Sequence, residues 1–339
     1  MTTAIENKNI ERYRKMVDII DNCTVRQAYT LLCDSKKVAS DVKPYYEIVV
    51  SKDALHSLRY ARDIVKGRFL LGEEAISKYA RWSYEYAREM FKGRWEPGEE
   101  VISKDADYSY MYARDAIKGR WEPGEEAISK DVGVSVSYAS DVLKAPWLAV
   151  EADISKDANA SYQYALNVIK GRWEPGEEAI SKDACASYEY ACNIIQGRWE
   201  PGEEAISKDG NAARRYAEDV IKGRWEPGEE AISKDYYCYR YALNVIKGRW
   251  EPGEEAISED AYTSYEYALH VIKGRWEPGE EAISKNFHYS YNYARDVLKG
   301  RFELGEAEIS KNKQMLAEYA FEVIKGRLPE HLEQILLES

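Results

Sequence analysis

The chain has 339 residues, a formal net charge of -12 and an isoelectric point near 5.1. This acidic balance argues against a protein that coats nucleic acid, because such proteins are typically basic. Its five cysteines form no C-x-x-C pair and its apolar runs are short, so we expect no zinc site, disulfide framework or membrane span.

The first forty-five residues do not follow the repeat found further along the chain. They begin with polar and charged residues, so we expect no signal peptide and predict a reduced, cytoplasmic protein, in the host cytoplasm if it is viral. Residues 10–20 have the pattern of an amphipathic helix, and Thr24 is placed to cap a second helix that includes Leu31 and Leu32. We therefore predict that residues 1–45 form an N-terminal helical cap.

Residues 46–329 contain one pattern about eleven times. Its Gly-Arg pair begins at Gly67, Gly93, Gly119, Gly171, Gly197, Gly223, Gly248, Gly274, Gly300 and Gly326. The step is 26 residues, except for one step of 25 after Gly223, and Ala145-Pro146 replaces the pair in the fourth unit. A fixed period of this length is typical of stacked repeats. The sequence predicts an all-α fold, a right-handed α-solenoid of about eleven long-helix/short-helix repeats with helical caps.

The third unit, residues 105–130, serves as the template. Asp105 is a suitable N-cap for a helix over residues 106–118, whose apolar residues recur at three- and four-residue steps. We expect Gly119 to adopt the left-handed conformation that ends this helix. Trp121 then returns the chain to the core, and Pro123 begins a second, shorter helix.

Four template residues are predicted to be structural: Tyr112, Ala113, Gly119 and Trp121. Large aromatic side chains with one polar group suit packing between successive units, although a ladder that stacks nucleic-acid bases is an alternative. We expect the repeated charges to form ion pairs between neighbouring rows. Two other interpretations stay open: the Lys-Gly-Arg edge binds a polyanion, or the acidic rows imitate the phosphate backbone of DNA.

Positions that vary between units on the exposed face of the long helix are the predicted partner-binding residues. The residue types at scaffold positions are fixed by packing, whereas those that contact an irregular partner must differ from unit to unit. The alternative is neutral substitution at solvent-exposed positions, which would produce the same variation. The residues concerned in the second and third units are Arg81, Trp82, Glu85, Asp107, Tyr108, Met111 and Arg114.

The fourth unit departs from the charged pattern. Val134 and the Leu148-Ala149-Val150 turn replace polar or turn residues, so we predict a contact for self-association or for the partner at Val134, Leu148 and Val150. The alternative is a degenerate repeat without a role in binding. At the other end, residues 330–339 are predicted to form a C-terminal capping helix.

Catalysis is not expected. The four histidines are scattered without metal-ligand spacing, and the chain has no phosphate-binding loop or nucleophile motif. We therefore predict no catalytic residue, no metal and no cofactor.

The segment from Tyr112 to Trp121, YARDAIKGRW, resembles short tandem repeats in uncharacterised proteins of tailed bacteriophages. This resemblance implies a viral protein that acts on a host protein, such as a defence protein or an enzyme. In layout, the unit also resembles leucine-rich variant repeats, which alternate a long and a short helix. We expect a protein-binding scaffold with a host or viral protein as partner. A nucleic-acid or nucleotide binder is the alternative.

Overall fold

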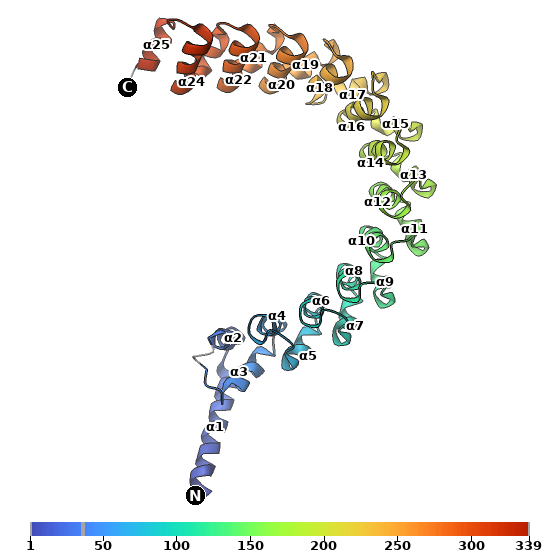
Figure 1. The fold of residues 1–339 in the computed structure, drawn as a ribbon, viewed down its shortest axis with the longest axis vertical. Coiled ribbons are helices and arrows are strands. Elements are labelled where there is room, and N and C mark those ends of the chain that lie inside the picture. Colours follow the sequence, from blue (N-terminus) through green and yellow to red (C-terminus); the bar gives the residue numbers. More distant parts are fainter. Residues whose placement is uncertain (1, 35–37, 338–339) are drawn as a thin grey trace. The chain divides into compact units, whose positions relative to one another are not determined.

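The computed structural model describes residues 2–34 and 38–337, and these residues form helices and no strand. They group into two compact units, one up to Ile154 together with Asn167–Ile169, the other formed by Ser155–Leu166 and the described residues from Lys170 onward. The repeat period gave no indication of this division. Within each unit, the long helices form one layer and the short helices a second (Figure 1). The predicted all-α solenoid of about 26-residue repeats is confirmed.

Three helices precede the first long helix of the repeats: α1 (Thr2–Asn22), α2 (Val25–Cys33) and α3 (Lys43–Val50). Thr24 caps α2 as predicted, and its side chain and that of Gln27 bond to each other's backbone amides. The α3 helix is equivalent to the short helix of a repeat. Its Glu47 accepts a 2.6 Å hydrogen bond from the hydroxyl of Tyr60 in the first repeat, as the glutamate of a short helix does from the tyrosine of the next repeat. The repeat pattern therefore extends back into α3.

Each long helix begins as an α-helix. Aspartate or asparagine caps most of them, and Asp105 accepts a 3.0 Å hydrogen bond from the amide of Tyr108, as predicted. The α-helical parts are α4 (Ala54–Arg59), α6 (Ala80–Tyr86), α8 (Ala106–Tyr112), α10 (Val132–Tyr138), α12 (Ala158–Tyr164), α14 (Ala184–Tyr190), α16 (Gly210–Arg215), α18 (Cys238–Tyr241), α20 (Ala261–Glu266), α22 (Phe287–Asn292) and α24 (Lys313–Glu318).

Every long helix then widens into a π-helical turn. These turns are η1 (Tyr60–Val65), η3 (Ala87–Phe91), η5 (Ala113–Ile117), η6 (Ala139–Leu143), η7 (Ala165–Ile169), η8 (Ala191–Ile195), η9 (Tyr216–Ile221), η11 (Ala242–Ile246), η13 (Tyr267–Ile272), η15 (Tyr293–Leu298) and η17 (Tyr319–Ile324). In the template, the backbone amides of Lys118 and Gly119 both donate hydrogen bonds to the carbonyl oxygen of Ala113, and these bonds close the widened turn.

The residue that ends the long helix is the lysine and not the glycine, so the prediction for Gly119 was wrong. Lys118 has a φ of 60°, ten of its equivalents also lie in the left-handed region, and no described glycine has a positive φ. A Cβ on Gly119 would meet nothing within 4 Å. The widened turn moves the left-handed position one residue earlier than the usual glycine end of a helix predicts.

The short helices begin after the tryptophan or phenylalanine of each unit, several of them through a 3₁₀ turn. The turns are η2 (Leu70–Gly72), η4 (Glu96–Gly98), η10 (Glu226–Gly228), η12 (Glu251–Gly253), η14 (Glu277–Gly279) and η16 (Glu303–Gly305). The helices are α5 (Glu73–Ile76), α7 (Glu99–Ile102), α9 (Glu122–Ile128), α11 (Leu148–Ile154), α13 (Glu174–Ile180), α15 (Glu200–Ile206), α17 (Glu229–Ser233), α19 (Glu254–Ser258), α21 (Glu280–Ser284) and α23 (Glu306–Ile309). The last described helix is α25 (Glu330–Leu337), at the predicted C-terminal cap.

One hydrogen-bond network joins successive repeats and accounts for the repeated GRWEPGE motif. Arg120 donates two hydrogen bonds of 2.8 and 3.0 Å to the carboxylate of Glu125. Glu125 accepts a 3.1 Å bond from the hydroxyl of Tyr138 in the next repeat, and this hydroxyl accepts from the amide of Trp121 at 2.8 Å. The motif of one repeat thus forms the binding site for the tyrosine of the next.

The template residues predicted to be structural, apart from Gly119, lie in the core. Tyr112 and Ala113 are completely buried and Trp121 is nearly so, with the rings of Tyr112 and Trp121 4.9 Å apart. A different glycine packs closely: a Cβ on Gly124 would lie 2.6 to 2.7 Å from Trp121 and Ser109. The second glycine of the motif is therefore the one that packing requires.

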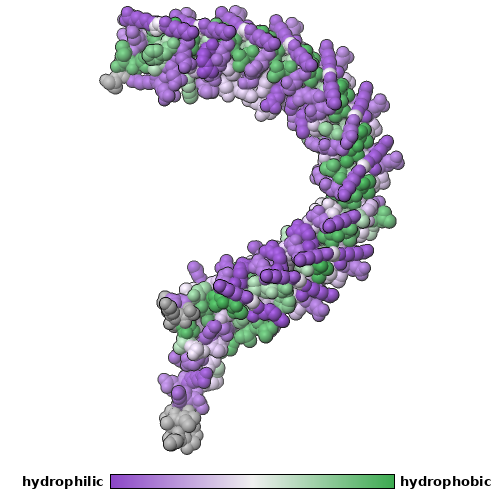
Figure 2. Space-filling model, in the orientation of Figure 1, coloured by the Kyte–Doolittle hydropathy of each residue, from purple (hydrophilic) through white to green (hydrophobic). Residues whose placement is uncertain are grey.

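The repeated surface charges pair within a repeat, and the expected pairing between rows was wrong for them. Lys130 contacts Glu126 at 2.8 Å across one turn, and Arg120 binds Glu125 of its own unit. Figure 2 shows the resulting hydrophilic side chains at regular intervals, with hydrophobic side chains between them. Exposed pairs such as Lys130–Glu126 each contribute at most about 1 kcal/mol to stability, so the core network, which includes Arg120 and Glu125, carries the larger share.

Candidate protein-binding face

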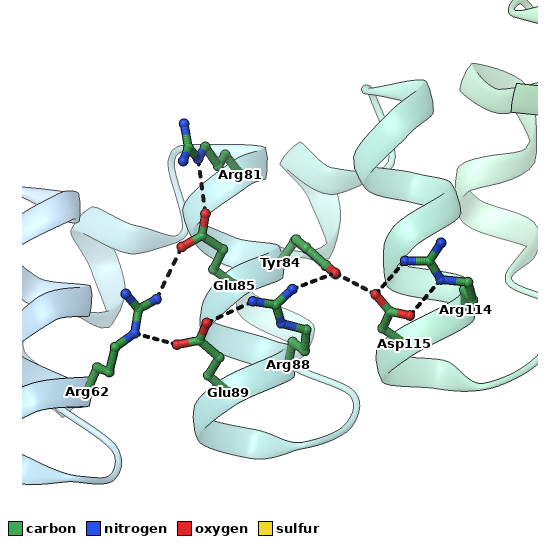
Figure 3. Close-up of polar contacts among 8 residues, drawn as sticks. All are labelled: Arg62, Arg81, Tyr84, Glu85, Arg88, Glu89, Arg114 and Asp115. Atoms are coloured by element: carbon green, nitrogen blue, oxygen red, sulfur yellow. Dashed lines mark hydrogen bonds and ion pairs between the residues drawn. The ribbon is translucent and has the colours of Figure 1, made fainter. Parts of the chain in front are cut away.

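The long helices of the first three repeats carry eight polar residues joined into one network, drawn in Figure 3. We call it the arginine–carboxylate network; its members are Arg62, Arg81, Tyr84, Glu85, Arg88, Glu89, Arg114 and Asp115. They come from η1, α6, η3 and η5, so the network crosses three successive repeats.

At the end of the arginine–carboxylate network that lies toward the first repeat, two arginines bind the same carboxylate. Arg81 donates to Glu85 at 3.0 Å across one turn of α6, and Arg62 of the preceding repeat donates to Glu85 at 3.2 Å. Arg62 also donates to Glu89. These ion pairs raise the pKa of Arg62 against the opposing effect of burial, so its charge is maintained.

The other end connects the second repeat to the third. Arg88 bonds Glu89 at 2.8 Å and the Tyr84 hydroxyl at 3.2 Å. That hydroxyl donates to Asp115, which also accepts two bonds of 2.7 and 2.9 Å from Arg114. The hydrogen bond from Arg114 is the main reason that the pKa of Asp115 is lowered. Arginine side chains held in this way present a fixed pattern of charge.

The tyrosine-to-carboxylate bond recurs along the chain. Equivalent bonds join Tyr110 to Asp141, Tyr188 to Asp219, Tyr265 to Asp296 and Tyr291 to Glu322, and a bond with a separation of 34 residues joins Tyr29 to Asp63. Tyr84, Glu89 and Asp115 were not predicted as members of a network. The signal for the repeated bond was a tyrosine and a carboxylate 31 residues apart, which is one repeat plus five residues.

The predicted partner-binding residues of the second and third repeats lie on this face. Arg81, Asp107 and Arg114 are exposed, whereas Trp82, Glu85, Tyr108 and Met111 are half-buried. Arg81 lies over the Trp82 ring at 4.5 Å, and the Tyr108 ring is 6.0 Å from that of Tyr84. Arg81, Glu85 and Arg114 belong to the arginine–carboxylate network, and the other four flank it.

Two of the three apolar residues predicted for the contact in the fourth repeat are accessible. Leu148 is 77% exposed and Val134 half-buried, but Val150 is only 2% exposed, so its assignment to a surface was wrong. Val150 stands where Gly124 stands in the template, a position where a Cβ would lie 2.6 Å from the Trp121 ring. The Tyr138 and Trp147 rings are 5.2 Å apart, compared with 4.9 Å for the template pair.

Other kinds of site receive little support from the described residues. In residues 2–34 and 38–337, no group of three or more histidine, cysteine or acidic side chains could hold a metal ion. None of the helices described is long and apolar enough to cross a membrane. In the Lys-Gly-Arg edge, Lys118 and Arg120 are both exposed, and Arg120 is ion-paired with Glu125.

Comparisons with known proteins add no assignment: no family model, no curated protein and no solved structure matches this chain.

Proposed function

We propose that this chain is a non-enzymatic protein-binding scaffold, made by a tailed bacteriophage to engage or inhibit a host protein, with host defence proteins as the first candidates. The bacteriophage origin rests on the resemblance of the YARDAIKGRW segment to phage tandem repeats. Binding is proposed at the long-helix face of the second and third repeats, around the arginine–carboxylate network.

One observation supports this proposal above the others. The repeated residues, such as Tyr112 and Trp121, are buried in contacts between repeats, whereas the positions that vary are accessible on one face. On that face, arginine and aromatic side chains lie together, as in Arg81 over Trp82. These residue types are enriched at protein interfaces and in the residues that contribute most to affinity.

The test reverses charges on this face and compares the result with a matched control. The face variant carries Arg81→Glu, Asp107→Lys and Arg114→Glu. The control carries Lys78→Glu, Glu100→Lys and Lys104→Glu, which changes net charge equally at exposed positions of the short-helix layer. Partners are purified from extracts of candidate host bacteria, identified by mass spectrometry and titrated as pure proteins.

We expect the face variant to bind the identified partner at least about tenfold more weakly, while the control stays within about twofold. Both variants should melt near the parent temperature, because the exchanged side chains are exposed and their ion pairs are weak. Equal affinity of both variants would show that the partner binds elsewhere. A chain that retains no protein would refute the proposed function itself.

A nucleic-acid or nucleotide binder, or an acidic DNA mimic, stays the second candidate. It depends on the row of exposed lysines equivalent to Lys118. The ion pair of Arg120 with Glu125 offsets the charge of that arginine and weakens its attraction for a polyanion. Binding to oligonucleotides that falls steeply with salt concentration would favour it.

A further inference from the structure

Most repeats of this chain bind the buried tyrosine of the repeat that follows, and the tenth repeat shows the groups involved. The hydroxyl of Tyr319 donates to Glu306 at 3.2 Å and accepts from the amide of Phe302 at 2.9 Å. Arg301 donates to the same carboxylate at 2.9 Å. An arginine, a glutamate and a backbone amide therefore form the site for one tyrosine hydroxyl.

The eleventh repeat carries the same groups without a tyrosine, and we call them the open tyrosine site: Arg327, Leu328 and Glu333. Arg327 donates to Glu333 at 2.9 Å, although this carboxylate lies six residues after its arginine and that of the tenth repeat lies five residues after. Leu328 stands at the position of Phe302. Among residues 2–34 and 38–337, no hydroxyl donates to Glu333 and no group accepts from the amide of Leu328. The Glu333 side chain is 27% exposed, compared with 5% for Glu306, so it is open to a donor from another molecule.

A mainly apolar hollow of about 540 Å³ adjoins the open tyrosine site, whose three residues belong to its lining. Ala320 also lines it and is half-buried, whereas the equivalent Ala113 and Ala294 are completely buried. Phe321 and Leu337 line it and are 82% and 74% exposed. The hollow therefore lies on the face that the next long helix covers in the other repeats.

An exposed tyrosine on α1 offers the missing hydroxyl. Ile19 of α1 is buried, but residues 8–15 are all exposed, and α1 extends away from α2 and α3 (Figure 1). In this exposed stretch, Tyr13 is 63% exposed and Ile10, one turn earlier, is 51% exposed. The Tyr13 hydroxyl makes no bond within the part of the chain that the structure describes. Tyr13 thus combines a free hydroxyl, an apolar neighbour and a position within a helix.

Three other tyrosines are comparably exposed and fit the site less well. Tyr79 precedes α6 as its N-cap residue and does not lie within a helix. The Tyr236 hydroxyl already donates to an aspartate at 3.1 Å, and the Tyr237 ring lies under an arginine at 5.0 Å. Tyr13 is therefore the helical tyrosine of this group with both its hydroxyl and its ring accessible.

The charges of the two surfaces are opposite. Residues 8–15 carry four basic side chains and one acidic side chain. Residues 318–333, which provide most of the lining of the hollow, carry four glutamates against one lysine and one arginine. Opposite net charges attract the two surfaces, and like charges disfavour contact between two copies of the same surface. The pairing that they favour joins α1 to the hollow.

We propose that copies of this chain associate head to tail, with α1 of one copy seated in the hollow of the next. The hydroxyl of Tyr13 donates to Glu333 and accepts from the amide of Leu328, and Ile10 packs against Phe321. The open tyrosine site is incomplete without the second copy. Each contact joins two different surfaces, so an open row of copies keeps one free surface of each kind and grows beyond a dimer. This inference does not depend on the proposed host partner.

Sedimentation velocity of the full chain at low salt, between about 1 and 100 µM, tests the association. We expect the sedimentation coefficient of the parent to rise with concentration, and to rise less at high salt because the charges are exposed.

Two variants each remove one of the two surfaces. Ile10→Ala with Tyr13→Ala removes the α1 surface, and Phe321→Ala with Glu333→Gln removes the surface of the hollow. Each variant alone should stay monomeric. Their mixture should form a one-to-one dimer and nothing larger, because each variant supplies the surface that the other lacks. Formation of this dimer also shows that both variants are folded.

Matched controls separate this contact from general effects. Glu303→Gln with Leu304→Ala makes similar exchanges at exposed positions of η16 and should associate like the parent. Tyr13→Phe removes one oxygen atom and should weaken association at least about tenfold, because the open tyrosine site loses its hydroxyl. Tyr79→Phe removes the same atom from another exposed tyrosine and should change association less than about twofold.

The inference is overturned by any of the following results. A parent chain that stays monomeric throughout the concentration range refutes the association. A mixture of the two surface variants that forms no dimer, or either variant alone associating like the parent, refutes the pairing of α1 with the hollow. Equal effects of Tyr13→Phe and Tyr79→Phe show that the Tyr13 hydroxyl does not enter the open tyrosine site. In each case, a host protein that binds the long-helix face still supports the proposed function.

Discussion

Removing one buried hydroxyl, by Tyr112→Phe, tests the network that joins the repeats. The hydroxyl accepts from the Trp95 amide at 2.7 Å and donates to Glu99 at 2.9 Å, while its ring packs on Trp121. Phenylalanine keeps the ring and loses both bonds. The loss leaves the buried Trp95 amide without an acceptor, which costs about 1–3 kcal/mol. Because Arg94 still neutralises Glu99, we expect a total loss of about 2–3 kcal/mol.

Tyr110→Phe is the matched control. Its hydroxyl also bonds to the next repeat, through Asp141, but the side chain is half-buried and the bond is exposed. Water can replace the lost partner, so we expect the cost to stay below about 1 kcal/mol. Both variants remove one oxygen atom from a tyrosine of the same helix.

Hydrogen exchange is the decisive measurement, because repeat proteins do not always unfold in a single step. A loss of about 2–3 kcal/mol should make the Trp95 amide exchange about 30- to 150-fold faster in Tyr112→Phe, and urea titration should show a lower midpoint. If Trp95 exchanges equally fast in both variants, the hydroxyl does not hold the repeats together and the assignment of the motif as its binding site is wrong.

Further predictions concern the turns and the response to pH. Gly124→Ala should destabilise by about 1–3 kcal/mol, because the new methyl group overlaps Trp121, whereas Gly119→Ala should change urea stability by less than about 1 kcal/mol. Lys118→Gly should stabilise by up to about 1 kcal/mol in the same titration, since glycine adopts the left-handed conformation without strain. Burial raises the pKa of Tyr138 to about 12, above about 10 in the unfolded chain, so its contribution is complete below pH ~10 and is lost as pH rises to about 12. Circular dichroism with tyrosinate absorbance should record unfolding in that window; retention of helix above it would contradict this assignment.

Local signals made much of the fold predictable. Asp105 and Thr24 cap helices where the sequence placed them, and Pro123 lies in the first turn of α9. These residues act on their own backbone or on that of the next turn, so no knowledge of the tertiary structure is needed. The period of 26 residues then required that each unit pack on its copies, which gave the all-α repeat architecture.

Contacts between distant residues were not predictable in the same way. The left-handed turn falls on Lys118 because the helix widens before it ends, and nothing in the local sequence marks this widening. Val150 is buried at a position where the template glycine has no room for a Cβ, and the bond from Tyr84 to Asp115 depends on the register between two repeats. The three-dimensional packing decides which side chains meet at these positions.

Residues that depart from the repeated sequence have different consequences, and these depend on the role of the same position in the other repeats. Val150 replaces a glycine at a position that is closely packed in the template, so this substitution concerns the packing of the fold. Glu259 replaces a lysine whose ion pair contributes at most about 1 kcal/mol, so the fold tolerates it while the local charge changes by two units. A substitution that costs the scaffold little and alters an exposed surface is the kind that binding can select.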